Sequence, residues 1–239
     1  MTASPVPCVA LDFGGTIARP GRSPRGEDVA AALRDRLGLP VPSGLARAVD
    51  QAKTAAKGAY RHSGQQTSWP EILTAAARIA EARIPDPGEL AAALWDIVPD
   101  GAVDPAAATA VRALRGQGHV LVLACNTRRP LASRRQTLAD AGIEDCFAAL
   151  VLSSELGAAK PDPQFYAAVL AAAHEHARCG PGGVVFAGDT LGKDAAGPVR
   201  AGMQAVLIHP GPGAPEGLPP GVPVLGHLSA LPGLLERWP

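Results

Sequence analysis

Aromatic side chains make up only 4% of this sequence, and its 22 basic side chains are balanced by 22 acidic ones. The scarcity of aromatics disfavours a surface that stacks nucleic-acid bases. Zero net charge provides no field that would attract nucleic acid or a membrane surface. No apolar run approaches the roughly 18 residues that a bilayer span requires. We therefore expect neither a nucleic-acid partner nor a membrane.

Cysteine is also rare, and no Cys-x-x-Cys pair is present. The four cysteines are widely spaced, at Cys8, Cys125, Cys146 and Cys179. This spacing disfavours a zinc site or a disulfide framework and fits a reducing compartment. The sequence does not open on a basic segment followed by a long apolar run, so we expect no signal peptide. These observations predict a cytoplasmic protein.

Five short apolar runs predict buried strands, over residues 8–11, 120–124, 149–152, 184–187 and 205–208. Helical patterns lie between most of them, over residues 106–115, 131–141, 163–177 and 194–201. Continuous apolar strands that alternate with helices are typical of a parallel sheet covered on both faces. The sequence therefore predicts an α/β fold, and its 47% of hydrophobic residues suffice for the core.

Residues 20–99 interrupt this alternation with four amphipathic helical patterns and no convincing strand. Segments rich in Gly and Pro flank them, at residues 20–24 and 99–101. We predict two domains: an α/β core of residues 1–19 and 100–239, and a helical domain of residues 20–99. A helical insert between two hinges is typical of a lid over a site.

Polar side chains follow four of the predicted strands, where ligands bind in an open parallel sheet. Asp12 ends the first strand, and Asn126 and Thr127 follow the second. The third strand leads to Lys160, and Asp189 ends the fourth. Four strand ends that deliver polar groups to one edge indicate an enzyme.

Three of these segments resemble motifs of the haloacid dehalogenase-like hydrolase superfamily. They read Asp12-Phe13-Gly14-Gly15-Thr16, Lys160-Pro161-Asp162-Pro163 and Gly188-Asp189-Thr190-x-x-x-Asp194. The resemblance extends from Asp12 to about residue 208. It implies a Rossmann-like core, a helical cap at the place of the insert, and Mg²⁺-dependent hydrolysis of a small phosphorylated molecule. We expect a monomer or a homodimer.

The resemblance also implies a role for each matching residue. Asp12 attacks phosphorus and forms an aspartyl-phosphate, and Lys160 neutralises both Asp12 and the phosphoryl group. Asp12, Asp189, Asp194 and the carbonyl of Gly14 hold Mg²⁺, which prefers oxygen ligands.

Five further residues are predicted to contact the phosphate or the rest of the substrate. The backbone amides of Phe13 and Gly14 provide oxyanion donors, and Thr16 shapes the loop that receives the phosphate. Asn126 contacts a phosphoryl oxygen, although asparagine is also common in turns. Arg128 reaches a second anionic group of the substrate.

Two positions depart from the pattern of the superfamily. Its phosphatases carry a second aspartate two residues after the nucleophile, where this chain has Gly14. That aspartate protonates the leaving group and later activates water. The second departure is Cys125, which replaces a Ser or Thr that contacts phosphate. A thiol is a weak hydrogen-bond donor, so we expect this contact to be weaker.

These departures leave three interpretations open. The first is a phosphatase whose leaving group needs little protonation, or receives a proton from the substrate itself or from the helical domain. The candidate in the helical domain is His62, in a predicted loop. The second is a hydrolase of C–P bonds that resembles phosphonoacetaldehyde hydrolases and uses Lys53 or Lys57 as a Schiff base. The third is a catalytically impaired member that binds a phosphorylated metabolite or a partner. A haloacid dehalogenase is disfavoured, because those enzymes work without Mg²⁺ and do not need the pair Asp189 and Asp194.

Overall fold

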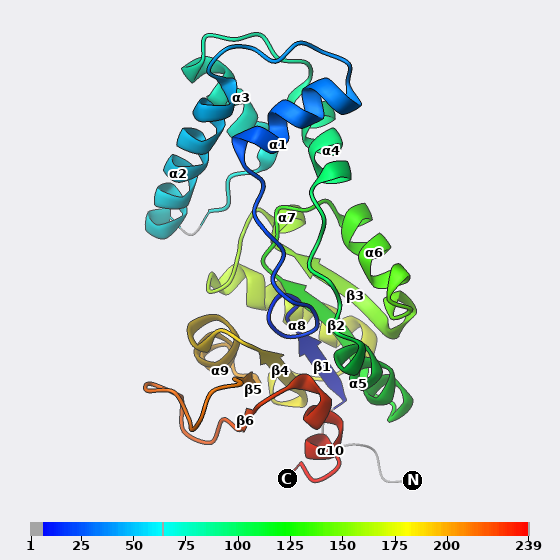
Figure 1. Cartoon of the computed structure of the whole chain (residues 1–239). Coiled ribbons are helices and arrows are strands. Elements are labelled where there is room, and N and C mark those ends of the chain that lie inside the picture. The colour runs from blue at the N-terminus through cyan, green and yellow to red at the C-terminus, as the bar shows by residue number, and fades with distance from the viewer. Residues whose placement is uncertain (1–6, 64, 239) are drawn as a thin grey trace. The chain divides into compact units, whose positions relative to one another are not determined.

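The computed structural model describes residues 7–63 and 65–238, and only the backbone of residues 61–63. The chain divides into two compact units, one formed by Met1–Pro20 with Gly101–Pro239 and the other by Gly21–Asp100. We call the first the sheet unit and the second the helical unit (Figure 1). None of the described helices combines the length and the apolar character that a membrane crossing requires.

In the described part of the sheet unit, six parallel strands form one sheet in the order β3-β2-β1-β4-β5-β6. They are β1 (Cys8–Leu11), β2 (Val120–Cys125), β3 (Phe147–Leu152), β4 (Val184–Gly188), β5 (Gln204–Ile208) and β6 (Val224–Leu225). The central strand β1 pairs with β2 on one side and with β4 on the other. This parallel α/β arrangement confirms the predicted fold class, and it brings the carboxyl ends of β1, β2 and β4 to one edge.

Helices cover both faces of the sheet (Figure 1). The helices α5 (Pro105–Gly116), α6 (Leu131–Asp140) and α10 (Leu231–Leu235) pack on the face that carries Val9 and Leu11. Helix α8 (Pro163–Ala177) packs on the opposite face, against Ala10 and Phe186. Because both faces are buried, each central strand is apolar along its whole length, which is why the sequence reveals these strands.

Several helices begin at an Asp-Pro pair. Asp86, Asp104 and Asp162 each precede a proline and accept hydrogen bonds from backbone N–H groups in the first helical turn. The carboxylate satisfies donors that have no partner inside the helix, and proline needs no donor at the first helical position. This chemistry explains why the predicted start of α8 coincides with the observed one, and it anchors the chain directly after Lys160.

The helical unit consists of α1 (Gly26–Ala31), α2 (Leu45–Ser63), α3 (Trp69–Ile79) and α4 (Pro87–Ile97), with a π-helical turn over Ala32–Arg36. Its own core contains residues of all four helices, such as Val29, Val49, Leu73 and Leu94. Trp69 and Trp95 meet edge to face, with ring centroids 5.9 Å apart. The unit therefore buries its apolar faces within itself.

Three predictions need correction. Strand β6 was not expected, because two residues between Pro- and Gly-rich segments produce no apolar run. The helix predicted over residues 194–201 begins earlier, as a π-helical turn over Leu191–Ala196 followed by α9 (Gly197–Arg200). The loop predicted around His62 is wrong, because residues 60–63 form the last turn of α2. The side chain of His62 lies outside the described residues.

Candidate active site

The loop after β1 sets Asp12 at the edge of the sheet. The Asp12 backbone N–H donates to the Ala187 carbonyl of β4 at 2.9 Å, which extends the strand pairing by one residue. The Phe13 carbonyl then accepts the N–H groups of Ile17 and Ala18, both at 2.9 Å, and closes a tight turn. Gly15 has φ +82, and a Cβ there would lie 2.1 Å from Oδ2 of Asp189. The turn therefore needs glycine at this position in order to pass close to Asp189.

Lys160 lies at the centre of the site and is 1% exposed. Its Nζ donates to Oδ1 of Asp12 at 2.8 Å, to Oδ1 of Asp194 at 2.7 Å and to the Ala124 carbonyl at 2.9 Å. An ammonium group has three donors, so these contacts account for all of them. The structure thus brings Asp12, Lys160 and Asp194 together, as the sequence predicts.

Burial and charge shift the pKa values of this cluster. Burial lowers the pKa of Lys160, but the charges of Asp12 and Asp194 raise it by more, so the ammonium stays protonated. Burial raises the pKa of Asp194 to about 6; the Lys160 charge opposes this rise, and the Asp12 charge adds to it. The pKa of Asp189 is also raised, first by burial and then by Asp12. The negative charge of Asp12 thus adds to the effect of burial on the pKa of both Asp189 and Asp194.

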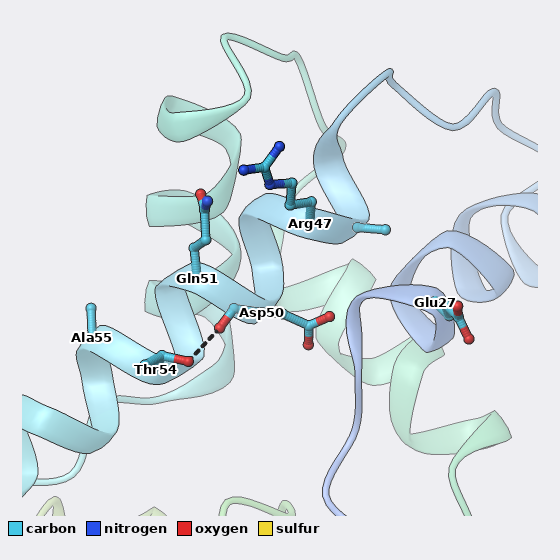
Figure 2. A pocket seen from close by; sticks show the side chains of 7 residues that line it. Glu27, Arg47, Asp50, Gln51, Thr54 and Ala55 are labelled. Atoms are coloured by element: carbon cyan, nitrogen blue, oxygen red, sulfur yellow. Dashed lines mark hydrogen bonds between the residues drawn. The ribbon is translucent and has the colours of Figure 1, made fainter.

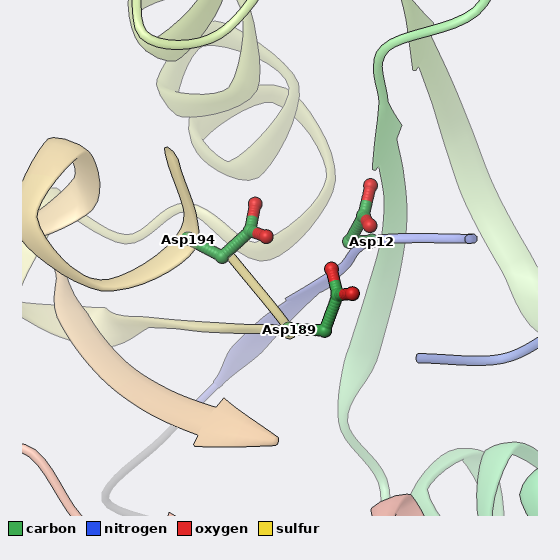
Figure 3. A group of neighbouring side chains, drawn as sticks. All are labelled: Asp12, Asp189 and Asp194. Carbon is green, nitrogen blue, oxygen red and sulfur yellow. The ribbon is translucent and has the colours of Figure 1, made fainter. Parts of the chain in front are cut away.

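Asp189 and Asp194 come from the segment that follows β4. Asp194 is 1% exposed, and its Oδ2 accepts the Thr190 N–H at 2.9 Å. At Gly188, the last residue of β4, a Cβ would lie 2.4 Å from Cγ of Asp194. The absence of a side chain at Gly188 thus lets Asp194 fold back over the strand end. Figure 3 shows the carboxylates of Asp12, Asp189 and Asp194 directed toward a common space.

The donor set of this space fits a magnesium ion. One carboxylate oxygen from each of Asp12, Asp189 and Asp194 lies within 4.8 Å of the others. Two oxygens that bind one Mg²⁺ at 2.0–2.1 Å lie at most about 4.2 Å apart, so these three need only a small adjustment or one bridging water. Three carboxylates and one ammonium also leave two negative charges uncompensated, which a divalent cation would balance.

The residues predicted to contact phosphate differ in burial and in hydrogen bonding. The side chain of Asn126 forms two hydrogen bonds with the backbone of Lys160. Cys125 is 2% exposed and belongs to the core of the sheet unit, and a weak contact between its thiol and phosphate stays a prediction. Thr16 is buried, and its hydroxyl has no hydrogen-bond partner among the described residues. Arg128 is half-buried in the loop after β2. The roles of the Phe13 and Gly14 amides and of the Gly14 carbonyl stay predictions.

Two further contacts at this edge were not predicted. The buried Arg134 of α6 places its guanidinium carbon 3.5 Å from the centroid of the Phe13 ring, next to the nucleophile candidate. The buried Ser153 bonds with the backbone of Thr127, accepting its N–H at 2.8 Å and donating to its carbonyl at 3.0 Å. Arg134 lies on a helix and Ser153 directly after a strand, and neither position predicts which ring or backbone group the side chain contacts.

A family model describes most of this chain. The model of the haloacid dehalogenase-like hydrolases matches residues 6–202, which include every candidate residue of the site described above. The chain belongs to the haloacid dehalogenase-like hydrolases. A comparison with curated protein sequences finds no match.

Solved structures of this family share the fold. A 2-haloacid dehalogenase from Pseudomonas syringae pv. tomato aligns with 98% of this chain and 100% of its own, with TM-score 0.68 and 22% identity. A phosphatase of the family from Thermococcus onnurineus aligns over 95% and 97% of the two chains, with TM-score 0.61 and 21% identity. The magnesium-bound hydrolase YfnB of Bacillus subtilis aligns over 95% and 97%, with TM-score 0.60 and 18% identity. At these identities the likeness establishes the fold and not the substrate.

Lys53 and Lys57, the candidates for a Schiff base in the helical unit of this haloacid dehalogenase-like hydrolase, differ in exposure and in contacts. Lys57 is exposed. Burial lowers the pKa of Lys53, as a nucleophilic amine requires. Its amino group, however, donates to the Pro24 carbonyl and lies 3.7 Å from Asp50. These contacts give Lys53 a structural role inside the helical unit, and cleavage of a C–P bond stays an untested interpretation.

An open groove of about 800 Å³ lies on the helical unit of this family member, between α1 and α2 (Figure 2). Its lining includes Glu27, Arg47, Asp50, Gln51 and Thr54. The Thr54 hydroxyl donates to the Asp50 carbonyl at 2.9 Å, and the Asp50 carboxylate accepts the Gly26 N–H at 3.1 Å. The first of these bonds lies within α2 and the second joins α2 to α1, so both are structural and we do not assign a reaction to the groove.

Proposed function

We propose that this hydrolase is a Mg²⁺-dependent phosphatase that transfers a phosphoryl group from a small molecule to Asp12 and then to water. The observation that supports this proposal best is the cluster of Asp12, Asp189 and Asp194 around the buried Lys160. A dehalogenase, which works without a metal, would have no use for the two further carboxylates of Asp189 and Asp194 beside Asp12. The helical unit is the proposed cap that selects the substrate.

In the proposed reaction, the site residues of the sheet unit have separate roles. An oxygen of Asp12 forms a bond to phosphorus while the bond from phosphorus to the leaving oxygen breaks. Lys160 holds Oδ1 of Asp12, which leaves Oδ2 for the attack, and keeps a fixed positive charge beside it. Water then attacks phosphorus, the bond to Asp12 breaks, and phosphate and the free carboxylate result. Asp12, Asp189 and Asp194 would hold Mg²⁺, which would supply positive charge that offsets the charge of the phosphoryl group.

Gly14 restricts the substrates that this site can process quickly. The position where related phosphatases carry a general acid has no side chain. General acid–base catalysis contributes about 10²–10⁴-fold to a rate. A leaving group that departs as a stable anion, such as a carboxylate or an activated phenolate, does not need this proton. We therefore infer that the substrate is an acyl phosphate or another phosphate with a leaving group of low pKa.

A panel of phosphate esters tests the proposal. We expect phosphate release from aryl and acyl phosphates in the presence of Mg²⁺, loss of release after chelation, and rates at least about 10²-fold lower on alkyl phosphates. Asp12→Asn is the control, because an amide cannot accept the phosphoryl group. Binding of these compounds without release would contradict the proposal and favour a binding module. Equal rates with and without Mg²⁺ would also contradict it.

A further inference from the structure

Asn126, the first residue after β2, makes two hydrogen bonds with the backbone of one residue, Lys160. Its Nδ2 donates to the Lys160 carbonyl at 2.9 Å, and its Oδ1 accepts the Lys160 N–H at 2.8 Å. The side-chain amide thus pairs with Lys160 much as a neighbouring strand would. We propose that Asn126 is a positioning residue that fixes where Lys160 stands beside Asp12 and Asp194, rather than a ligand of the phosphoryl group. This inference rests on the proposed function.

Lys160 depends on such a contact because its own segment is irregular. It lies in a turn between α7 (Ser153–Leu156) and α8, and the Asp162 N–H closes this turn on the Ala159 carbonyl at 2.9 Å. The next residue is Pro161, which has no N–H to offer to a neighbouring segment. Buried backbone groups need partners. Asn126 provides partners for both backbone groups of Lys160.

The end of β2 and the residue after it therefore hold both the backbone and the ammonium group of Lys160. The Ala124 carbonyl accepts Nζ at 2.9 Å, and two residues later Asn126 holds the backbone. With both ends fixed to the same strand end, the side chain has a defined reach. That reach places Nζ between Asp12 and Asp194, at 2.8 and 2.7 Å.

The loop that carries Asn126 is fixed as well. The buried Ser153 accepts the N–H of Thr127 at 2.8 Å and donates to its carbonyl at 3.0 Å. The residue after Asn126 is thus bound to the first residue of α7, directly after β3. A side chain that turned toward a phosphoryl oxygen would have to break two well-formed bonds, so the contacts favour positioning over ligand binding.

A double-mutant cycle between Asn126→Ala and Lys160→Met tests this inference on an aryl phosphate with a good leaving group. If Asn126 acts through the Lys160 ammonium, Asn126→Ala lowers kcat about 10- to 100-fold in the wild type and leaves KM nearly unchanged. In the Lys160→Met background, the same substitution then has almost no effect on kcat, because no ammonium remains to be positioned. The urea midpoint falls equally in both backgrounds, because Asn126 bonds backbone groups that the Lys160→Met substitution leaves in place.

Two outcomes overturn the inference: an equal factor in kcat in both backgrounds, or a raised KM and weaker inhibition by inorganic phosphate. Asn126→Asp is the matched variant, because it keeps the acceptor for the Lys160 N–H and loses the donor; we expect a loss of kcat here too. If the wild type released no phosphate, the proposed function would fail. The crystal structure of Asn126→Ala would then test whether Asn126 positions Lys160. Displacement of Nζ from Asp12 and Asp194 would support positioning, and an unmoved Nζ would refute it.

Discussion

Replacing Gly14 by aspartate raises the rate of alkyl phosphate hydrolysis by about 10²–10⁴-fold, the usual contribution of a general acid. The site has room for this side chain, because a Cβ at Gly14 would meet no other heavy atom within 4 Å. The backbone there is also not in the left-handed region, so a larger residue causes no strain. The new carboxyl group would supply the missing proton to the leaving oxygen and then activate water. The measurement is kcat/KM for an alkyl and an aryl phosphate.

Two controls separate acid catalysis from other effects of the new side chain. Gly14→Asn fills the same space without a transferable proton, and we expect no gain from it. Gly116→Asp makes the same change at an exposed glycine of α5 with open space around it, and should leave both rates unchanged. An equal gain on both substrates, or a gain with asparagine, would show that the missing acid does not limit the enzyme.

Replacing Lys160 by methionine lowers kcat by about 10²–10³-fold, a typical cost of losing a preorganised charge. Without the ammonium, the buried carboxylates of Asp12 and Asp194 face each other uncompensated. No fixed positive charge then remains beside Asp12 to offset the charge of the phosphoryl group. Breaking a buried ion pair also costs about 3–5 kcal/mol of stability. Single-turnover kinetics and urea unfolding measure the two effects.

Bound metal should restore part of this lost stability. Mg²⁺ would offset the charge of the remaining carboxylates, so we expect the urea midpoint of Lys160→Met to rise more with Mg²⁺ than that of the wild type. Arg200→Met is the control, because it removes a cation from an exposed position of α9. A Lys160→Met variant with wild-type kcat would remove Lys160 from the mechanism.

The parts of the fold that the sequence predicts are those that depend on local chemistry. Strand β1 is predicted to the residue, because a parallel strand buried on both faces has no polar position. Helix α8 is predicted to the residue because Asp162 and Pro163 define its start. Strand β6 and the last turn of α2 were missed, because a two-residue strand and a helix end have no comparable signal.

In the candidate site, too, some features can be predicted from the sequence and others cannot. Asp12, Asp189, Asp194 and Lys160 come from strand ends and motifs that can be read directly, and the structure brings their charged groups together. The role of Asn126 could not be read, because asparagine at the same place can bind a phosphate or a backbone. Only the distances to Lys160 distinguish the two.

The central claim is that Asp12 receives the phosphoryl group. The most direct measurement is acid quenching of the wild-type enzyme during turnover of an aryl phosphate, followed by mass spectrometry of the peptide that contains Asp12. Because Gly14 provides no base to activate water, we expect the phosphorylated enzyme to accumulate, with one phosphoryl group on Asp12. Steady release of phosphate from an enzyme whose Asp12 never carries a phosphoryl group would contradict the account.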